Sequence, residues 1–480
     1  MKPSPYQQAI FDDIKKGILL EAYSLVIEAV AGSGKTTTIV KSLEQIPGSA
    51  RVLFGAFNKH IATELQSRVP TNVTASTLNS IGWAMCKRMN PKVRLDANKT
   101  DGILKNVVNK PTYMKMRATV PRIVSLLKAN CNREARPGDI RLIVDEHDMN
   151  VDNLDDTISV VGQVYELAIE NTDVMDFDDQ IFMPWYWNVT PVKVDWFFGD
   201  EAQDFSPVQI ELVRKLSDRI VCVGDSRQAI YGFRGASVDA MAILKEKIVA
   251  HELPLSISYR CAKEVVRAAQ QIVPHIEFAD SAIEGKVDRI KALKLNLVSN
   301  DYVLCRTTAP LVSYALREIR NGKKATVLGR DIGKQLISMV NAIGNDRLTI
   351  EEYYKHLQAY HEEQTRKLTA QEASESRLLA LNDRVETIKA LMGACALTDK
   401  AQLVIAYKIN LIFGDDPEKD SIIFSTVHKS KGLEADNVFI IAPHLLPHPS
   451  AKKEWQRHQE ANLHYVAITR AKKQLTYVDE

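Results

Sequence analysis

The sequence has few cysteines, and no two of them lie close enough together to suggest a shared site. The six cysteines of the 480 residues form no C-x-x-C pair. This argues against a zinc site, an iron–sulfur cluster or a disulfide framework, and it fits a reduced setting. No apolar run reaches the roughly 18 residues of a membrane span, and MKPSPYQQAIFDDIKKG at the N-terminus has no apolar signal core. We therefore expect a cytoplasmic protein with no membrane partner.

The sequence also lacks an excess of either charge. Sixty-two basic residues face sixty acidic ones, for a formal net charge of +2. Any contact with nucleic acid must therefore come from a local basic groove and not from a global field. Apolar residues make up 45% of the chain, which is enough for several cores, and the length predicts about three domains.

One segment, SLVIEAVAGSGKTTTIV, carries a nucleotide-binding pattern. An apolar strand leads into a loop containing Gly32, Ser33 and Gly34, and a helix opens at Lys35 and Thr36. The loop N–H groups and the positive helix end would face the phosphates, Lys35 would reach the outer two, and Thr36 could ligate Mg²⁺. Ala29 stands where the strict pattern has its first glycine. An ordinary glycine-rich turn is the alternative, but the flanking strand and helix favour a P-loop that binds ATP.

A second apolar strand, in VDWFFGDEAQD, delivers Asp200 and Glu201 to its C-terminal end. Such a position suits a Mg²⁺ ligand and a carboxylate that accepts the proton of an attacking water. We expect Asp200 to hold the metal and Glu201 to be the general base. An acidic pair at this place can also be a helix N-cap, but its occurrence downstream of a P-loop favours catalysis.

Short apolar runs alternate with helical stretches along the chain, which is typical of parallel sheets. The first series is SLVIEA, RVLFGAF, VDWFFGD and RIVCVGD; the second is DYVLCR, ATVLG, SIIFST, NVFIIA and LTYV. The fold class is therefore α/β, with two domains and a cleft between them.

Two helical stretches interrupt the alternation, so each domain is expected in two pieces. The predicted boundaries are 1–87 with 186–281 for the first domain, 88–185 for its helical insertion, 282–330 with 416–480 for the second domain, and 331–415 for the second insertion. The second insertion has spaced apolar positions such as Leu357, Leu368, Leu378 and Leu381, but no sustained heptad. A solvated helical arm or hairpin is favoured there over a coiled-coil partner site.

Collinear motifs resemble those of superfamily 1 DNA helicases of the UvrD, Rep and PcrA type. VGDSRQAIYGFRGA resembles the third helicase motif of that family, LSISYR the fourth, STVHKSKGLEAD the fifth and NLHYVAITRAKK the sixth. The resemblance implies two RecA-like P-loop domains in tandem, each with a mostly helical insertion. ATP would bind with Mg²⁺ in the cleft between them and drive movement along single-stranded or tailed duplex DNA.

The resemblance also implies roles around the nucleotide. Gln7 in PYQQAI would contact adenine, although Gln8 leaves the register open, and Tyr259 would stack on the base. Arg260 and Gln228 would reach the terminal phosphate. Arginines that neutralise charge around the transferred group suit phosphoryl transfer; exposed salt bridges are the alternative.

Further nucleotide-site roles follow from the fifth and sixth motifs. Glu434 would bind the ribose, and Arg470 would be the arginine finger from the second domain. Thr37 takes the place where relatives often have an arginine that packs on adenine.

Candidate DNA contacts are aromatic or polar residues in loops at the tops of the domains, where bases can stack on rings. Core packing of the rings is the alternative. The positions matching the family are Phe57, Asn58, Thr77, Tyr231, Phe233, Arg234 and His428. Two departures accompany them, because Asn79 replaces a frequent histidine and Phe233 replaces a tryptophan.

The insertion before the fifth motif is much shorter than in the well-known bacterial members, so the regulatory 2B domain is expected to be reduced or rebuilt. Two other functions stay open. One is a translocase that strips proteins from DNA and unwinds poorly. The other is a nucleic-acid-sensing NTPase subunit that signals to a protein partner such as a nuclease. YGFRGA and HKSKGLE resemble the UvrD branch of the superfamily more than its 5′ to 3′ branch. This resemblance implies 3′ to 5′ movement along the bound strand.

The histidines near the C-terminus could suggest a metal site, but Pro-rich flanks indicate a loop, and no Cys or carboxylate completes a recognisable set. They are His444, His448, His458 and His464. We expect them to be loop residues that face solvent or DNA.

Overall fold

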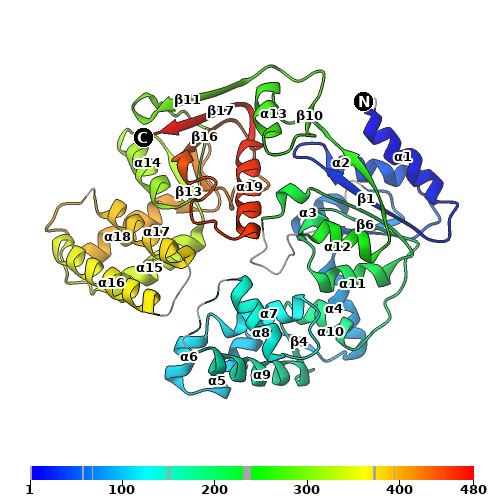
Figure 1. Ribbon diagram of the computed structural model, residues 1–480, viewed down its shortest axis with the longest axis horizontal. Helices are drawn as coiled ribbons and strands as arrows, with labels where there is room; N and C mark the ends of the chain where they lie inside the picture. The colour runs from blue at the N-terminus through cyan, green and yellow to red at the C-terminus, as the bar shows by residue number, and fades with distance from the viewer. Residues whose placement is uncertain are drawn as a thin grey trace. The chain divides into compact units, whose positions relative to one another are not determined.

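The computed structural model describes residues 3–56, 59–66, 69–147, 149, 151, 153–230, 239–370, 375–393 and 395–480, without the side chains of 59–61, 64, 375 and 376. The chain divides into two compact units, Met1–Ser256 and Ile257–Glu480. Each unit has one large parallel sheet flanked by helices (Figure 1). The expected α/β class with two parallel sheets is confirmed.

The sheet of the first unit has the strand order β3-β2-β6-β7-β1-β8, and every neighbouring pair is parallel. Its central strands are almost wholly buried, as expected where helices cover both faces. The strands are β1 (Tyr23–Ala29), β2 (Val52–Ala56), β3 (Val73–Thr77), β6 (Trp196–Gly199), β7 (Arg219–Gly224) and β8 (His251–Leu255).

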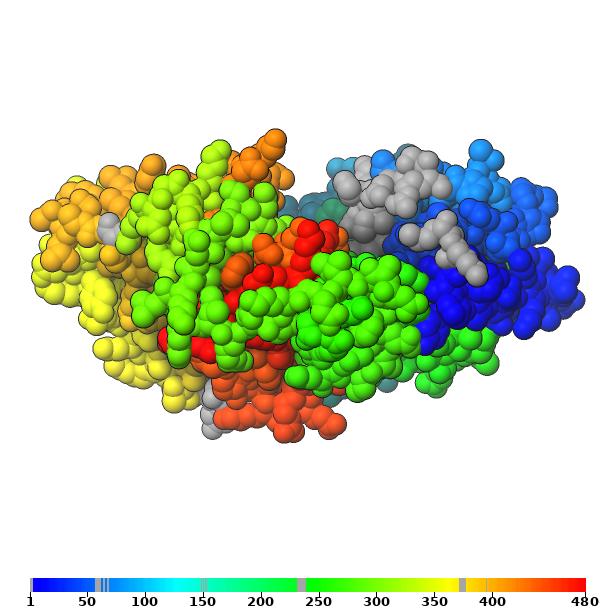
Figure 2. Space-filling view, turned by 90° about the horizontal axis from the view of Figure 1, so that it is seen from above, coloured from blue at the N-terminus to red at the C-terminus, as the bar shows by residue number. Residues whose placement is uncertain are grey.

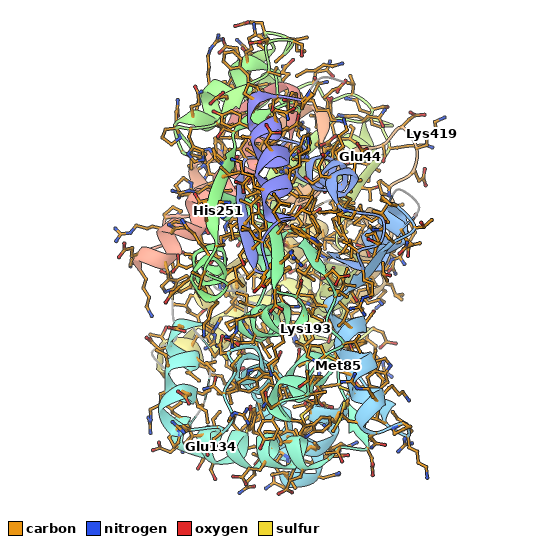
Figure 3. All side chains as sticks on the ribbon, turned by 90° about the vertical axis from the view of Figure 1, so that its right-hand side faces the viewer. Glu44, Met85, Glu134, Lys193, His251 and Lys419 are labelled. Carbon is orange, nitrogen blue, oxygen red and sulfur yellow. The ribbon has the colours of Figure 1, made fainter. Side chains whose placement is uncertain are left out.

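Helices pack on both faces of this sheet. Leu25 and Ile27 of β1 share a core with α1, α2 and α3, whereas Val26 joins the core of α11 and α12 on the other face. His251, the first residue of the edge strand β8, lies beside α1 and contacts Asp13 (Figure 3). The helices are α1 (Pro5–Gly17), α2 (Lys35–Ser42), α3 (Lys59–Gln66), α11 (Pro207–Leu216) and α12 (Ala240–Lys247).

The first insertion is helical, and its core is continuous with that of the sheet. Met85 of α4 lies among these helices (Figure 3) and belongs to the same core as Val26 and Leu53. The helices are α4 (Leu78–Met89), α5 (Lys99–Val107), α6 (Lys110–Met116), α7 (Val120–Ala129), α8 (Pro137–Glu146), α9 (Leu154–Glu170) and α10 (Asp179–Tyr186), with a small parallel pair β4 (Arg94–Leu95) and β5 (Val174–Met175).

A buried ion network fastens the helices of this insertion together. The Nζ atom of Lys99 on α5 lies 2.7 Å from Asp179 Oδ2 and donates to the Ala168 carbonyl at 2.6 Å. The Nζ atom of Lys128 on α7 lies 2.8 Å from Asp179 Oδ1 and 3.1 Å from Asp176 Oδ2. Because all four charged groups are buried, removing one would leave an unpaired charge inside the protein.

The sheet of the second unit has the order β11-β17-β16-β12-β15-β13-β14, again parallel throughout. Its strands are β11 (Lys286–Lys291), β12 (Tyr302–Cys305), β13 (Ala325–Leu328), β14 (Phe413–Gly414), β15 (Ile422–Thr426), β16 (Ala435–Ile441) and β17 (Ala471–Asp479). A separate short pair joins β9 (Ile257–Ser258) to β10 (Glu277–Phe278).

The second insertion packs on the sheet and is not the solvated arm that we expected. Val385, Ile388 and Leu391 of α17 are fully buried and share one core with Val303 and Phe424 of the sheet. In Figure 2 the yellow and orange residues of this insertion form one continuous mass. The helices of the unit are α13 (Lys263–Gln270), α14 (Ala309–Arg320), α15 (Arg330–Ile343), α16 (Ile350–Ala370), α17 (Glu375–Met392), α18 (Ala401–Ile412) and α19 (Glu454–Ile468).

The division between the units lies earlier in the chain than the predicted boundary at 281. Residues 257–281 belong to the second unit because α13 packs against β11 and β17. The N–H of Ala262 also donates to the Lys472 carbonyl at 2.8 Å.

We predict that Gly82→Ala destabilises the first unit. A Cβ atom at Gly82 on α4 would come within 2.0 Å of the Gln180 carbonyl oxygen on α10, a backbone atom that cannot move alone. The expected loss is about 3 kcal/mol in the free energy of unfolding, measured by urea denaturation. Gly162→Ala in α9 is the matched control, because its Cβ meets nothing within 4 Å. It should stabilise the protein by about 0.5–1 kcal/mol. Equal effects of the two changes would contradict the close contact.

Candidate nucleotide and nucleic-acid site

The residues predicted for the triphosphate site meet at one edge of the first sheet. Strands β6, β7 and β1 are neighbours and run parallel, so their carboxyl ends lie at the same edge. The P-loop follows β1, and Asp200 and Glu201 follow β6. Gln228 lies in the short 3-10 turn η3 (Ser226–Gln228), which follows β7. The fold therefore gathers chemistry from three distant parts of the sequence.

The loop after β1 has the backbone of an anion-binding nest. Gly32 and Gly34 adopt φ values of 73° and 77°, which a residue with a side chain rarely adopts. Residues with positive φ in such a loop direct its N–H groups to one side. Helix α2 begins directly after Gly34, so its N-terminus faces the same loop. Ser33 Oγ is buried and has no hydrogen-bond partner among the described residues. The loop thus offers a polar hydroxyl and a concave row of N–H groups, which fits a phosphate.

Gln7, and not Gln8, is connected to the nucleotide loop. Gln7 Nε2 donates to Thr38 Oγ1 at 3.0 Å, and Thr38 Oγ1 donates to the Gly34 carbonyl at 2.9 Å. Gln8 instead donates to Asp12 on the exposed side of α1. Of the two neighbouring glutamines, Gln7 is therefore the one whose side chain is joined to the nucleotide loop. Thr38 was not among the predicted residues.

Two contacts join the P-loop helix to the acidic pair. Thr36 Oγ1 donates to Asp200 Oδ2 at 2.5 Å, and Lys35 Nζ lies 3.9 Å from Glu201 Oε1. Glu201 has a left-handed backbone with φ of 53°, and its N–H donates to Asp200 Oδ1 at 2.9 Å. Thr37, in contrast, is exposed on the outer side of the helix. A hydroxyl beside a carboxylate is a suitable ligand pair for Mg²⁺.

Burial destabilises the ionised carboxylates at this edge of the sheet when no cation is bound. Burial and the neighbouring charge of Glu201 raise the pKa of Asp200 to about 6, against the opposing effects of Thr36 and Lys35. Burial also raises the pKa of Asp225, which lies at the end of β7. A divalent cation would offset the clustered negative charge, so the residues fit Mg²⁺ bound together with a triphosphate.

Gln203 connects the acidic pair to the turn after β7, a link that the sequence analysis missed. Gln203 Nε2 donates to Glu201 Oε2, and Gln203 Oε1 accepts from the Asp225 N–H at 3.0 Å. Asp225 Oδ2 in turn accepts from Gln228 Nε2 at 2.6 Å. Gln203 lies in the DEAQD motif and Asp225 in the VGD motif, and both motifs were recognised in the sequence. Neither motif indicates that these two residues contact each other.

In the second unit, Glu434 is engaged by two cations. Arg260 Nε forms an ion pair with one of its carboxylate oxygens, and Lys472 Nζ lies 2.7 Å from the other. Although burial acts in the opposite direction, the hydrogen bond from Lys472 and the charge of Arg260 keep the pKa of Glu434 below its usual range. Tyr259, next to Arg260, is 47% exposed. An exposed ring beside this cluster is compatible with the base-stacking role predicted for it.

Arg470 lies inside the second unit, with 1% of its surface exposed. Its Nε donates to the Val466 carbonyl at 3.1 Å, and its Nη1 donates to the Leu433 carbonyl at 3.0 Å. Burial and the nearby charge of Arg260 lower the pKa of Arg470 to about 10. The guanidinium is thus held by main-chain carbonyls next to the Arg260 cluster, an arrangement that the sequence pattern did not indicate.

Two of the predicted DNA contacts lie in the described part of the chain. Thr77 ends β3 and caps α4, where its Oγ1 accepts from the Ser80 N–H at 3.1 Å. His428 follows β15 and is partly buried; burial and the charge of Arg306 lower its pKa to about 3, so it is neutral at physiological pH. The others lie outside the described residues: Phe57, Asn58, Tyr231, Phe233 and Arg234.

The departure at Asn79 has a structural explanation. Asn79 Nδ2 donates to the Phe177 carbonyl at 3.0 Å and to Gln180 Oε1 at 3.1 Å. Its amide therefore joins α4 to the segment that begins α10.

Among the described residues, no three His, Cys, Asp or Glu side chains are grouped to hold a metal ion by themselves. No described helix combines the length and the apolar character needed to cross a membrane.

Comparison with known proteins agrees with this geometry. Residues 12–249 match the model of the UvrD/REP helicase N-terminal domain, and residues 421–478 match that of the UvrD-like helicase C-terminal domain. The chain belongs to the UvrD-like helicases. The first matched range contains the P-loop and the acidic pair, the second contains Glu434 and Arg470, and Arg260 lies between the two ranges.

Individual relatives of this UvrD-like chain are distant. F-box DNA helicase protein 1 of Schizosaccharomyces pombe is 24% identical over 95% of this chain and 55% of its own length. The ATP-dependent DNA helicase PcrA of Staphylococcus aureus is 24% identical over 62% of this chain and 44% of its own. The chain thus spans about half the length of these curated relatives.

A solved structure of an arterivirus helicase, nonstructural protein 10, covers 95% of this chain and 59% of its own. Its TM-score of 0.36 and 13% identity are too low to locate any residue.

We predict that Asp200→Asn stabilises the protein at pH 8 in the absence of Mg²⁺ and nucleotide. The pKa of Asp200 is raised from 3.8 to about 6 in the folded state. The folded protein therefore binds this proton more tightly, and stability is lost as the pH rises through 6. Removing the charge should recover about 1–3 kcal/mol at pH 8, and the gain should shrink toward pH 5.

Urea unfolding between pH 5 and 8 measures this difference. The control is Asp195→Asn near the start of β6, where the carboxylate is 44% exposed. A variant that is less stable than the wild type at every pH would contradict the cost assigned to the buried charge.

We predict that Arg470→Ala both destabilises the second unit and lowers ATP turnover more than ATP affinity. Truncation removes the hydrogen bonds that Arg470 donates to the Val466 and Leu433 carbonyls and opens a cavity, which should cost about 2–4 kcal/mol. Arg289→Ala is the control, because Arg289 is 61% exposed and pairs with Asp479 at the surface. Its effect should stay within about 0.5 kcal/mol. Thermal unfolding followed by ATPase assays on the folded fraction separates the two effects, and a fully stable Arg470→Ala protein would refute the buried role.

Proposed function

We propose that the chain is an ATP-dependent DNA helicase that translocates along single-stranded DNA in the 3′ to 5′ direction. The observation that carries the proposal is the pairing of Thr36 with Asp200 and of Lys35 with Glu201 at one sheet edge. Membership in the UvrD-like helicases supports it, and two relatives carry the name DNA helicase.

Each residue at this edge has a proposed task. The N–H groups of Gly32, Ser33 and Gly34 hold the phosphates, and Lys35 neutralises the outer ones. Thr36 and Asp200 hold Mg²⁺, which when bound supplies charge neutralisation during phosphoryl transfer.

Water activation is assigned to Glu201. Gln203 donates to one of its oxygens, and Lys35 lies near the other, so the carboxylate is fixed in orientation beside the phosphate loop. A carboxylate fixed in this way can accept the proton of an attacking water. Glu201→Gln should therefore keep Mg²⁺-ATP binding and lose turnover.

The second unit is proposed to supply Arg260 and Arg470 to the same reaction, with Tyr259 and Glu434 contacting the base and ribose. Hydrolysis between the two units rests on the resemblance alone. Arginines donated from a moving part make hydrolysis depend on closure, and two conformations with different affinity for the strand convert that cycle into movement. The DNA contacts are proposed at Thr77, His428 and the five positions outside the described residues.

Strand displacement on tailed duplexes tests the function and its direction. With Mg²⁺-ATP, a duplex with a 3′ single-stranded tail should be opened and one with only a 5′ tail should not. Lys35→Ala should abolish both opening and ATP hydrolysis while remaining folded, because the outer phosphates lose their neutralising charge.

The other outcomes separate the alternatives. Opening of the 5′-tailed duplex alone would overturn the direction but not the ATPase site. DNA-stimulated hydrolysis without strand separation would indicate a translocase, and hydrolysis without stepping, in a stable complex with an effector protein, would indicate a sensing subunit. Normal turnover in folded Lys35→Ala would remove the P-loop assignment.

A further inference from the structure

A carboxylate that the proposed reaction does not use lies beside the nucleotide loop. Glu28 on β1 precedes the loop, and its Oε1 accepts two hydrogen bonds from Ser226, from the N–H at 2.9 Å and from Oγ at 2.7 Å. Burial is the main cause that raises the pKa of Glu28, and the hydrogen bonds from Ser226 oppose it. A carboxylate in this place is costly, and its hydrogen bonds go to one residue.

Ser226 is the first residue of the turn that carries Gln228. Within this turn, the Arg227 N–H donates to Asp225 Oδ1 at 3.0 Å and Gln228 Nε2 donates to Asp225 Oδ2 at 2.6 Å. The turn is therefore a small closed unit, and its orientation depends on what holds its ends. Glu28 holds it from β1, the strand that also leads into the P-loop.

The other side of the turn is held by close packing and by Gln203. The Asp225 N–H donates to Gln203 Oε1, and a Cβ atom at Gly224 would come within 2.7 Å of the same oxygen and 2.5 Å of Met241 Sδ. Gly224 thus leaves no room for a side chain on the side that faces Gln203. Movement away from it, toward β1, is limited by the bonds between Glu28 and Ser226.

We propose that Glu28 is a positioning residue for ATP hydrolysis: through Ser226 it fixes the turn that holds Gln228 at a set place relative to the P-loop. The proposal rests on the proposed function, since Gln228 is the side chain expected to meet the terminal phosphate. Glu28 is not among the residues proposed to hold the nucleotide or Mg²⁺. Its effect therefore belongs to turnover and not to ATP binding.

Four variants test whether Glu28 positions the turn through Ser226. Glu28→Leu removes the acceptor and should lower kcat for DNA-stimulated ATP hydrolysis about tenfold, with KM for ATP changed less than about twofold. Glu28→Gln keeps an oxygen that accepts from both Ser226 donors, so it should retain most of the turnover. Ser226→Ala keeps the N–H donor and should lower kcat by only about two- to threefold.

The double variant decides whether Glu28 acts through Ser226. If it does, Glu28→Leu with Ser226→Ala should be no slower than Glu28→Leu alone, because the second change removes a bond that is already lost. Glu252→Leu on the neighbouring strand β8 is the matched control. It removes a carboxylate that pairs with Lys245 at 2.9 Å instead of with Ser226, so kcat should not change.

Amide hydrogen exchange provides a readout that does not depend on activity. Peptides covering 219–230 should exchange faster in Glu28→Leu than in the wild type, and not in Glu252→Leu. Faster exchange with an unchanged kcat would reduce Glu28 to a structural role and overturn the proposal, as would unchanged exchange or additive effects in the double variant. A wild-type protein without ATPase activity would instead overturn the proposed function itself, and the positioning role with it.

Discussion

The parallel pairing of β6, β7 and β1 is the constraint on which the candidate site depends. Parallel strands end at one edge, so loops that are far apart in the sequence must meet there. The same constraint creates the electrostatic problem of the site, because Asp200 and Asp225 become buried close to Glu201. Thr36, Lys35 and Gln203 compensate only in part, and a bound divalent cation would complete the balance.

Much of this arrangement could be predicted because the strands that form it are uninterrupted apolar runs. All nine predicted strand segments are strands in the structure, and the P-loop and the acidic pair lie where strand ends place them. The strands that were missed lack this signal. β8 contains Pro254 and lies at a sheet edge, and β11, also an edge strand, alternates charged with apolar residues in KVDRIK.

The sequence could not indicate contacts between side chains that lie far apart in the chain and belong to no common motif. Gln203 is three residues from Asp200 in the chain, yet its partner Asp225 comes from another strand. The sixth motif predicts Arg470 as an arginine finger, whereas in the structure its Nε and Nη1 donate to carbonyls of its own unit. The second insertion reads as solvated because its buried positions are spread over several helices, and only their packing on the sheet shows that they form a core.

The ion network of the first insertion has a consequence for work at different ionic strengths. Salt screens exposed charges over a Debye length of about 10 Å at 0.1 M but acts much less on buried pairs. Lys99, Lys128, Asp176 and Asp179 are buried, whereas pairs such as Lys193–Asp218 are more than half exposed. Contacts between a protein and DNA phosphates weaken steeply with added salt. If the chain is the proposed DNA helicase, raising the salt concentration should therefore release the DNA strand while the helices that carry this network stay joined to one another.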